Sequence, residues 1–183
     1  MDAIKNLSQV LNPITEEEEA TAAVALILTP VNRDVSVLFV KRVERPQDPW
    51  SGQVALPGGK RDPADKTLKE TVVRETAEET GINILNCGFL GVLKTHISLP
   101  RPGMKILPFV ILCDDEPLIT LNTEELEEFF WISLTELAAK KGRISFPFGE
   151  FPAYIIGDHT IWGLTYKIIE DFFQALADTY RVE

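Results

Sequence analysis

The sequence predicts an α+β protein, an α/β/α sandwich in which a mixed β-sheet lies between helical layers. Two runs of β-branched and aliphatic residues stand near the start, a capped helical pattern follows, and further strand and helix patterns continue to the end. The 183 residues, 45% hydrophobic and 25% charged, suffice for one domain with its own core and exclude a disordered chain. We expect an N-terminal extension over residues 1–20 and a single domain over residues 21–183.

The first pattern after the extension is a β-hairpin. Ala22–Leu28 and Val35–Val40 are short runs of the residues that strands favour, and a turn-forming segment separates them. The extension itself predicts a short helix over Ala3–Leu11 and a solvated acidic run over Glu16–Glu19. Prolines and glycines over residues 46–59 predict a long loop, and long ordered loops in compact domains are often functional.

A helix over Thr67–Glu79 is the best-defined element. Thr67 with Glu70 fits a capping box, and Gly81 fits the position that follows a helix. The later elements are predicted at Phe89–His96 and Lys105–Cys113 (strands), before Trp131 (a short strand), and at Ser133–Lys141 and Trp162–Tyr180 (helices, the first followed by Gly142).

Charge and composition exclude several classes of protein. The formal net charge is −10, from 28 acidic and 18 basic residues, which argues against the basic face that binds duplex nucleic acid. The longest apolar run is far shorter than the roughly 20 residues of a membrane span, and no secretory pattern is seen. Cys87 and Cys113 make a weak case for a disulfide and fit a reducing cytosol. We expect a cytoplasmic protein with no nucleic-acid or membrane partner.

Three carboxylates share one face of the predicted central helix. Helical spacing places Glu75, Glu78 and Glu79 within roughly a 100° arc. Like charges at this spacing destabilise a helix, so the pattern favours a compensating hard cation such as Mg²⁺, which prefers oxygen ligands. Arg74, four residues before Glu78, can hold one of the carboxylates. From these residues alone, the alternative is an exposed helix with surface salt bridges.

The segment resembles the Nudix hydrolases, whose box contains the pattern R-E-U-x-E-E-x-G-U, where U is a bulky apolar residue. The matching residues are Arg74, Glu75, Glu78, Glu79, Gly81 and Ile82. Three features depart from the family pattern. The spacing from Gly59 to Arg74 is one residue longer, the family's first glutamate is replaced by Asp65 or displaced, and Thr76 takes a position that is usually apolar.

Two further segments, Ser51–Gly59 and Ile161–Thr165, are similar to the coenzyme A diphosphatase branch of that family. The resemblance implies a mixed sheet between helices. It also implies Mg²⁺-dependent hydrolysis, with Mn²⁺ as a substitute, of a diphosphate bond in a nucleoside diphosphate linked to another group, such as coenzyme A or its derivatives. ADP-ribose or an oxidised nucleotide is the alternative substrate. A Nudix-fold nucleotide-binding module without catalysis is the alternative from another class.

The resemblance also implies the roles of individual residues. Glu75 and Glu79, followed by Glu78, are the implied metal ligands, together with the backbone carbonyl of Gly58. Hydrolysis of a diphosphate requires charge neutralisation, activation of water and a carboxylate that accepts a proton. The candidate catalytic residues are Glu75, Glu78, Arg74 and Glu125. Glu125 belongs to an acidic turn, for which a solvated surface is the alternative.

Five residues near the box are candidates for binding substrate. Arg42 and Arg45 can bind a distal phosphate such as the 3′-phosphate of coenzyme A, Gly59 and Lys60 can meet phosphate oxygens, and Trp50 can stack on a base. For each of them the alternative is an ordinary surface or packing role. The aromatic residues over 146–154 can likewise stack on a base, with ordinary packing as the alternative. We also expect a homodimer in which the extension and the hairpin pair across an interface.

Overall fold

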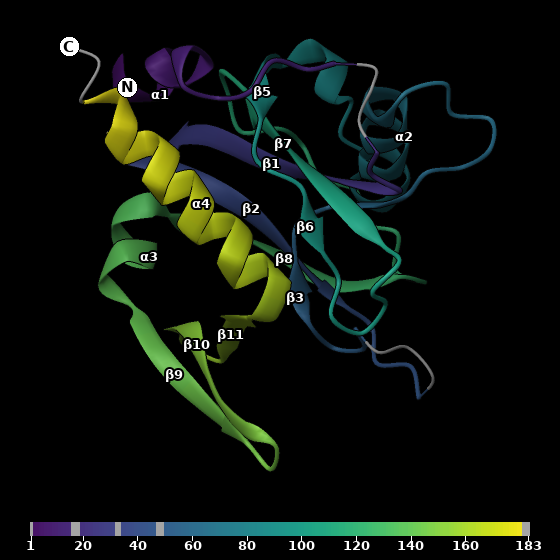
Figure 1. Cartoon of the computed structure of the whole chain (residues 1–183), viewed down its shortest axis with the longest axis vertical. Helices are drawn as coiled ribbons and strands as arrows, with labels where there is room; N and C mark the ends of the chain where they lie inside the picture. The colour runs from purple at the N-terminus through teal and green to yellow at the C-terminus, as the bar shows by residue number, and fades with distance from the viewer. Residues whose placement is uncertain (1, 16–18, 32–33, 47–49, 181–183) are drawn as a thin grey trace.

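The computed structural model describes residues 2–15, 19–31, 34–46 and 50–180 (Figure 1). In these ranges the helices and strands are α1 (Asp2–Asn6), β1 (Ala22–Val31), β2 (Asp34–Arg42), β3 (Val54–Ala55), β4 (Gly58–Lys60), α2 (Leu68–Thr80), β5 (Gly88–Val92), β6 (His96–Ile97), β7 (Lys105–Leu112), β8 (Leu126–Ser133), α3 (Leu134–Ala139), β9 (Lys141–Phe146), β10 (Gly149–Ile156), β11 (His159–Trp162) and α4 (Gly163–Thr179). Short 3-10 helices lie at Leu7–Gln9 and Ile84–Asn86.

The main sheet is mixed, as the sequence predicts. Its strands follow the order β3-β2-β1-β7-β5, with β4 added to β1, β6 to β7 and β8 to β2. β1 is antiparallel to β2 but parallel to β7, so the centre of the sheet combines both kinds of pairing. The predicted hairpin of β1 and β2 is confirmed.

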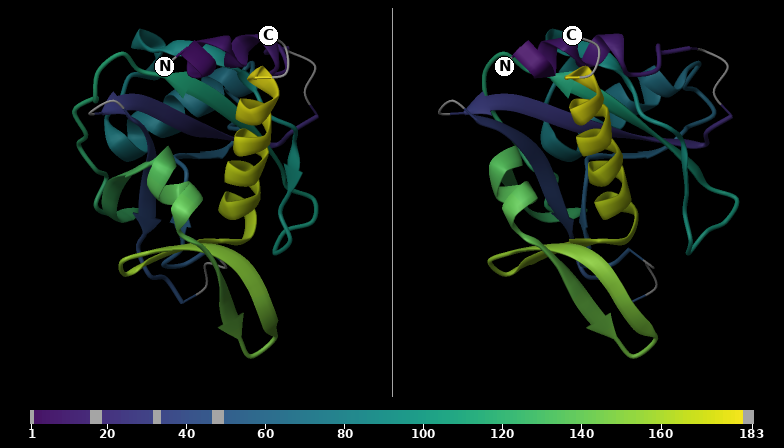
Figure 2. Two further views of the ribbon diagram at one scale, coloured as in Figure 1. Left: turned by 90° about the vertical axis from the view of Figure 1, so that its left-hand side faces the viewer. Right: turned by 60° about the vertical axis from the view of Figure 1, so that its left-hand side comes forward.

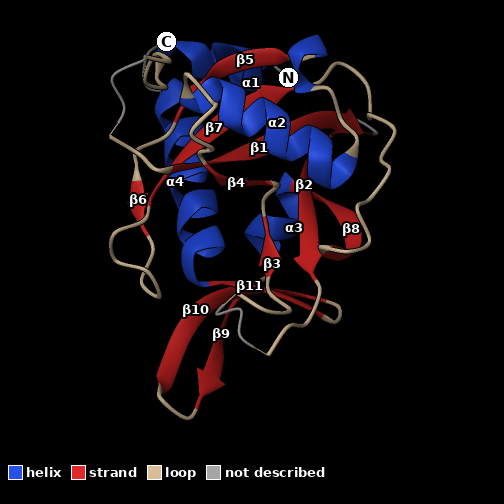
Figure 3. Ribbon diagram, turned by 90° about the vertical axis from the view of Figure 1, so that its right-hand side faces the viewer, coloured by secondary structure: helices blue, strands red, loops and turns tan. Residues whose placement is uncertain are grey.

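Alternation along β1 divides the core into two layers. Leu26 and Leu28 pack on the side of α1 and α4, whereas Ala25 and Ile27 pack on the side of α2. The helical residues that complete the layers are Ile4, Leu7, Ile168 and Phe172 on the first side and Leu68 and Val72 on the second. Figures 1 and 3 show α4 and α2 on opposite faces of the sheet. Since successive side chains of a strand face opposite ways, this pattern produces the predicted α/β/α sandwich.

The two central strands separate at one end, and this separation positions the site. β1 and β2 pair over Leu28–Val31 and Asp34–Val37. At its other end, β1 pairs over Ala22–Val24 with β4 instead, and the N–H of Ala25 donates to the carbonyl of Pro57 at 2.8 Å. The chain between β2 and α2 therefore enters the fork between the strands and carries the two glycines of β4 beside α2.

Local signals fix both ends of α2. The Thr67 hydroxyl oxygen accepts from the N–H of Glu70 at 3.1 Å, as the capping box predicts. Gly81 adopts a left-handed conformation at φ 72°, and its N–H donates to the carbonyl of Ala77 at 2.9 Å. A glycine reaches this conformation without the steric cost of a Cβ atom, so the helix ends where the sequence indicates.

A second sheet, β11-β10-β9, is not predicted from the sequence. The helix expected over Ser133–Lys141 ends at Ala139, and Gly142, expected just beyond that helix, lies within β9. The hairpin of β9 and β10 projects away from the main sheet (Figure 2). Aromatic rings pack together within this second sheet, with the ring centroids of Phe146 in β9 and Trp162 in β11 4.5 Å apart. The aromatic segment 146–154 is thus a strand hairpin with its own ring contacts.

The N-terminal segment packs within the same chain. The helix expected over Ala3–Leu11 appears as α1 followed by a 3-10 turn, and Ile4 and Leu7 are buried in the layer that contains α4. Of the predicted acidic run, Glu16–Glu18 lie outside the described residues. The exposed Glu19 pairs with Lys105 at 2.6 Å.

Cys87 and Cys113 form a disulfide in this structure, although the sequence makes only a weak case for one. Gly88 and Leu112 are register partners of the antiparallel β5 and β7, so the cysteines flanking this pair face one another with Cα atoms 4.5 Å apart. A sequence separation of 26 residues does not reveal this register.

No described helix combines the length and the apolar character that a membrane span requires.

Candidate active site

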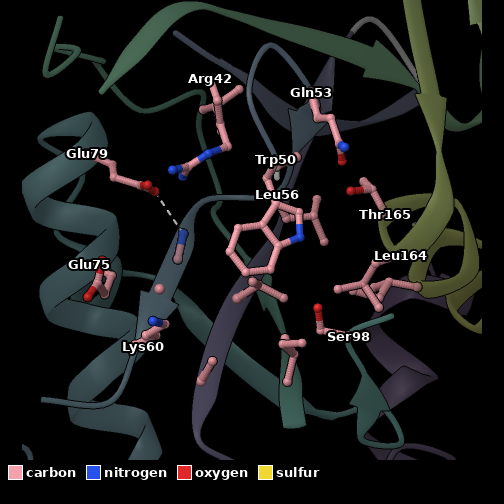
Figure 4. A pocket seen from close by; sticks show the side chains of 18 of the residues that line it. Arg42, Trp50, Gln53, Leu56, Lys60, Glu75, Glu79, Ser98, Leu164 and Thr165 are labelled. Atoms are coloured by element: carbon pink, nitrogen blue, oxygen red, sulfur yellow. Dashed lines mark hydrogen bonds between the residues drawn. The ribbon is translucent and has the colours of Figure 1, made fainter. Parts of the chain in front are cut away.

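A cavity of about 340 Å³ opens at the fork between β1 and β2. Glu75 and Glu79 of α2 reach it from one side, and Glu125 reaches it from the turn before β8. Arg42, at the end of β2, also lines it. Figure 4 shows Glu75, Glu79 and Lys60 on one side of the cavity and Ser98, Leu164 and Thr165 on the other. The fold thus gathers three of the predicted carboxylates at one end of a single cavity.

Glu79 is the most deeply buried of these carboxylates. Its side chain accepts a hydrogen bond from the N–H of Gly58 at 2.8 Å, and the residue is only 3% exposed. Burial raises the pKa of Glu79 to about 8, with further raising by the negative charges of Glu75 and Glu125. The Gly58 N–H and the positive charge of Arg42 oppose this shift. A buried carboxylate whose neighbours are carboxylates is stabilised in its charged form by a cation.

Glu75 lies beside the glycine loop. Burial raises its pKa, the charges of Glu78 and Glu125 add to the shift, and Arg74 opposes it. One carboxylate oxygen accepts from Arg74 Nη1 at 2.8 Å. A Cβ atom at Gly59 would lie 2.2 Å from Glu75 Oε2, so the absence of a side chain there lets this carboxylate approach β4.

We expect Gly59→Ala to lower kcat roughly tenfold or more while the protein remains folded. The added methyl group would meet the end of the Glu75 side chain rather than backbone, so the carboxylate must move away from its position. The measurement is kcat together with the melting temperature, and Gly103→Ala is the matched control, since nothing lies within 4 Å of its Cβ position. Unchanged kcat in Gly59→Ala would contradict this placement of Glu75.

Arg74 joins the box helix to the loop before it. Its guanidinium donates to both carboxylate oxygens of Asp65, at 3.1 and 2.8 Å, and also to Glu75 and Glu78. Asp65 is buried and accepts a further bond from the Thr71 hydroxyl at 2.9 Å. The hydrogen bonds from Arg74 hold the pKa of Asp65 well below its usual range. Arg74 is therefore a positioning residue that holds one side of Glu75.

Three predicted site residues, Arg74, Glu78 and Arg45, are not part of the cavity lining. Glu78 has an exposed side chain and pairs with Arg74 at 3.1 Å. Arg45 is exposed, and its guanidinium donates to the carbonyl of Glu124 at 2.5 Å. The other predicted substrate-binding residues line the cavity: Arg42, Trp50, Gly59 and Lys60. Arg101 lies over the Trp50 ring, 4.8 Å from its centroid.

The donor chemistry of the carboxylate end fits a hard divalent cation. Within the described residues, no three His, Cys, Asp or Glu side chains converge closely enough to form a ready-made ion site. The buried Glu79, the partly buried Glu75 and the exposed Glu125 nevertheless interact electrostatically and line one cavity. Carboxylate oxygens are the ligands that Mg²⁺ prefers, and Mg²⁺ retains several waters, so it needs only one or two of these groups.

Comparison with known proteins decides the family. Residues 19–148 match the NUDIX domain, which is well over half of the chain. The chain belongs to the Nudix hydrolase family. Mitochondrial coenzyme A diphosphatase NUDT8 from Homo sapiens is 33% identical over 171 residues, 88% of this chain and 72% of that protein. The Mus musculus protein of the same name is 33% identical over 169 residues, covering 86% and 79%.

Solved structures agree on the Nudix fold. A MutT/nudix family protein from Enterococcus faecalis matches with a TM-score of 0.60 and 21% identity, over 91% of this chain and 66% of that chain. The MutT protein from Methanosarcina mazei Go1 matches with a TM-score of 0.54 and 22% identity, over 91% and 97%. At these identities the likeness shows the fold alone.

Several residues of the cavity are not predicted from the sequence. Ser98 follows β6, and Leu164 and Thr165 begin α4, far along the chain from the Nudix box. The similarity of Ile161–Thr165 to one family branch was the only signal that pointed toward the start of α4. No pattern in the sequence singles out Ser98.

Proposed function

We propose that the protein hydrolyses, with Mg²⁺, the diphosphate bond of coenzyme A or its derivatives. The observation that carries this proposal is the 33% identity to coenzyme A diphosphatases over most of the chain. The cavity supports it, because carboxylates and the cations Arg42 and Lys60 share one end. Such an end suits a diphosphate held through metal ions.

Glu75 and Glu79 would hold the metal, and Glu78 and the Gly58 carbonyl are further candidate ligands. Bound Mg²⁺ polarises phosphoryl oxygens and lowers the pKa of bound water. The Gly58 N–H and Arg74 fix the carboxylates of Glu79 and Glu75, respectively, before substrate arrives. Arg42 and Lys60 line the same end of the cavity and can bind the phosphate oxygens.

Glu125 is the proposed general base. It lines the cavity but is exposed, and Asn122 Nδ2 donates to its Oε1 at 3.3 Å. An exposed carboxylate can pass a proton to solvent, which suits a base that acts on the attacking water. In the reaction the water oxygen bonds to one phosphorus, the bridging P–O bond breaks, and the proton goes to the carboxylate.

The substrate is tested by offering purified protein coenzyme A, ADP-ribose and 8-oxo-dGTP, each with Mg²⁺, and identifying products by mass. We expect coenzyme A to give 3′,5′-ADP and 4′-phosphopantetheine with the highest kcat/KM, and no turnover in excess chelator. Faster turnover of another substrate would reject the coenzyme A assignment and retain the hydrolase. No turnover with Mg²⁺ or Mn²⁺ would favour a nucleotide-binding module without catalysis.

The domain bounds, the location and the oligomeric state of the protein are further proposals. The domain is proposed to span residues 21–183, although Ile4 and Leu7 share its core. A cytoplasmic location stays a prediction, and the named mammalian relatives are mitochondrial. A homodimer also stays a prediction, and the buried face of the N-terminal segment is already used within one chain.

A further inference from the structure

A buried hydroxyl lies across the cavity from the carboxylates. Ser98 is 1% exposed, and among the described residues no group is hydrogen-bonded to its Oγ. The residue lines the same cavity as Glu75 and Glu79, and Figure 4 shows its hydroxyl directed into that space. Buried polar side chains are rarely left without a partner, so this hydroxyl calls for a group that enters the cavity.

The backbone around Ser98 is extended and turns this side chain toward the interior. His96 and Ser98 are buried, whereas Ile97 and Leu99 between and after them are 58% and 75% exposed. This alternation is that of an extended strand, and the N–H of Ser98 donates to the carbonyl of Met104 at 3.0 Å. Ser98 directly follows β6, which pairs with β7, so this pairing and the hydrogen bond to Met104 place its backbone beside the cavity.

The surroundings of Ser98 are largely apolar. Leu164 lies beside Ser98 in Figure 4, the backbone of Met104 is hydrogen-bonded to Ser98, and the apolar side chains of Val24, Ile106 and Ile168 line the same cavity. Thr165 also lines it, but the Thr165 hydroxyl already donates to the carbonyl of Val54 at 3.1 Å. The charged residues labelled in Figure 4 lie on the other side of the cavity from Ser98. A sugar with several hydroxyl groups would lose hydration here without equivalent partners, whereas an aliphatic chain with isolated amides would not.

We propose that Ser98 is a specificity-determining residue that hydrogen-bonds an amide in the non-nucleotide part of the substrate, an aliphatic amide chain. The inference rests on the proposed function, because the diphosphate must lie at the carboxylate end for the chain to reach Ser98. A serine hydroxyl both donates and accepts, so it can pair with either the N–H or the carbonyl of an amide.

The test compares two substrates that share 3′-phospho-ADP and differ in the attached chain. One is coenzyme A, and the other carries a plain alkyl chain of similar length without amides. In Ser98→Ala we expect kcat/KM for coenzyme A to fall about fivefold, the effect of one neutral hydrogen bond, with the alkyl substrate changed less than twofold. Ser98→Thr retains the hydroxyl and should restore most of the loss. Ser145→Ala removes an exposed hydroxyl on the β9–β10 hairpin and should leave kcat/KM unchanged for both substrates.

Two results would overturn the proposal: an equal loss on both substrates, which indicates a merely structural role, or no loss on coenzyme A. Failure of the proposed function is a separate outcome, in which the wild type hydrolyses neither substrate. Calorimetric binding of coenzyme A then decides the role of Ser98. Weaker binding by Ser98→Ala than by the wild type supports the proposal, and equal affinity rejects it.

Discussion

Glu79→Gln is expected to reduce kcat for coenzyme A by a factor of about 100 to 1,000. Metal ions supply several kcal/mol of charge stabilisation to such reactions, and each 1.36 kcal/mol corresponds to a factor of ten in rate. The amide of glutamine can still accept the Gly58 N–H but cannot offer the cation a negative charge. The matched control is Glu116→Gln, which neutralises an exposed carboxylate that does not line the cavity. Equal activity of Glu79→Gln and the wild type would remove Glu79 from the proposed metal site.

The same substitution is expected to stabilise the metal-free protein at pH 8. The pKa of Glu79 is about 8 in the folded protein, against an ordinary value of 4.5. Between these pH values the folded protein holds a proton that the unfolded chain has released, so stability falls as pH rises through this window. Glutamine cannot ionise and avoids this loss. In excess chelator we expect the melting temperature of Glu79→Gln to exceed that of the wild type by about 5 °C at pH 8.

The difference in melting temperature should shrink as the pH falls and should vanish below 4.5, where the folded and the unfolded wild type are both protonated at this position. A wild type more stable than Glu79→Gln at pH 8 without metal would contradict the raised pKa of this buried carboxylate. Confirmation would show that the chain retains a destabilising group for function, as active sites commonly do.

Asp65→Asn should produce the second large effect, a loss of stability together with a loss of activity. Asp65 is buried, and Arg74 donates to both of its carboxylate oxygens. Breaking a buried ion pair costs about 3–5 kcal/mol, but the Arg74 side chain is 30% exposed, so we expect about 2 kcal/mol. This lowers the melting temperature by roughly 4–8 °C. We expect kcat to fall about tenfold, because Arg74 also holds Glu75.

The contribution of Asp65 to stability depends on pH with the opposite sign to that of Glu79. Because the folded-state pKa of Asp65 is lowered, its contribution to stability is present above about pH 4 and is lost as the pH falls further. The gap in melting temperature between the wild type and Asp65→Asn should therefore narrow between pH 7 and pH 3. Asp62→Asn removes an exposed carboxylate from the same loop and should change stability by less than about 0.5 kcal/mol. A gap that does not depend on pH would argue against the ion pair.

The sequence predicts those parts of the fold that depend on local signals. The ends of α2 follow from Thr67 and Gly81, and the hairpin follows from the two strand patterns. Strand register has no local signal, which is why the pairing of Cys87 with Cys113 was not foreseen. The β9–β11 sheet was missed because its glycines and prolines resemble loop residues in sequence.

In the candidate site, too, some residues are predicted from local signals in the sequence and others are not. Glu75 and Glu79 follow from helical spacing and the Nudix resemblance, but the sequence leaves open whether Asp65 replaces the family's first glutamate or that glutamate is displaced. The structure pairs Arg74 with Asp65, which explains how the longer loop still anchors the box. Ser98 could not be predicted, because its position depends on the pairing of β6 with β7 and on α4 packing across the cavity.

The most direct test of the account is the release of 3′,5′-ADP from coenzyme A, measured against Mg²⁺ concentration for the wild type and Glu79→Gln. We predict saturable, Mg²⁺-dependent release by the wild type, none in excess chelator, and at least about a 100-fold lower rate for Glu79→Gln at every Mg²⁺ concentration. Release by the wild type that is independent of Mg²⁺, or a Glu79→Gln variant as fast as the wild type, would contradict a metal-dependent diphosphatase built on this carboxylate.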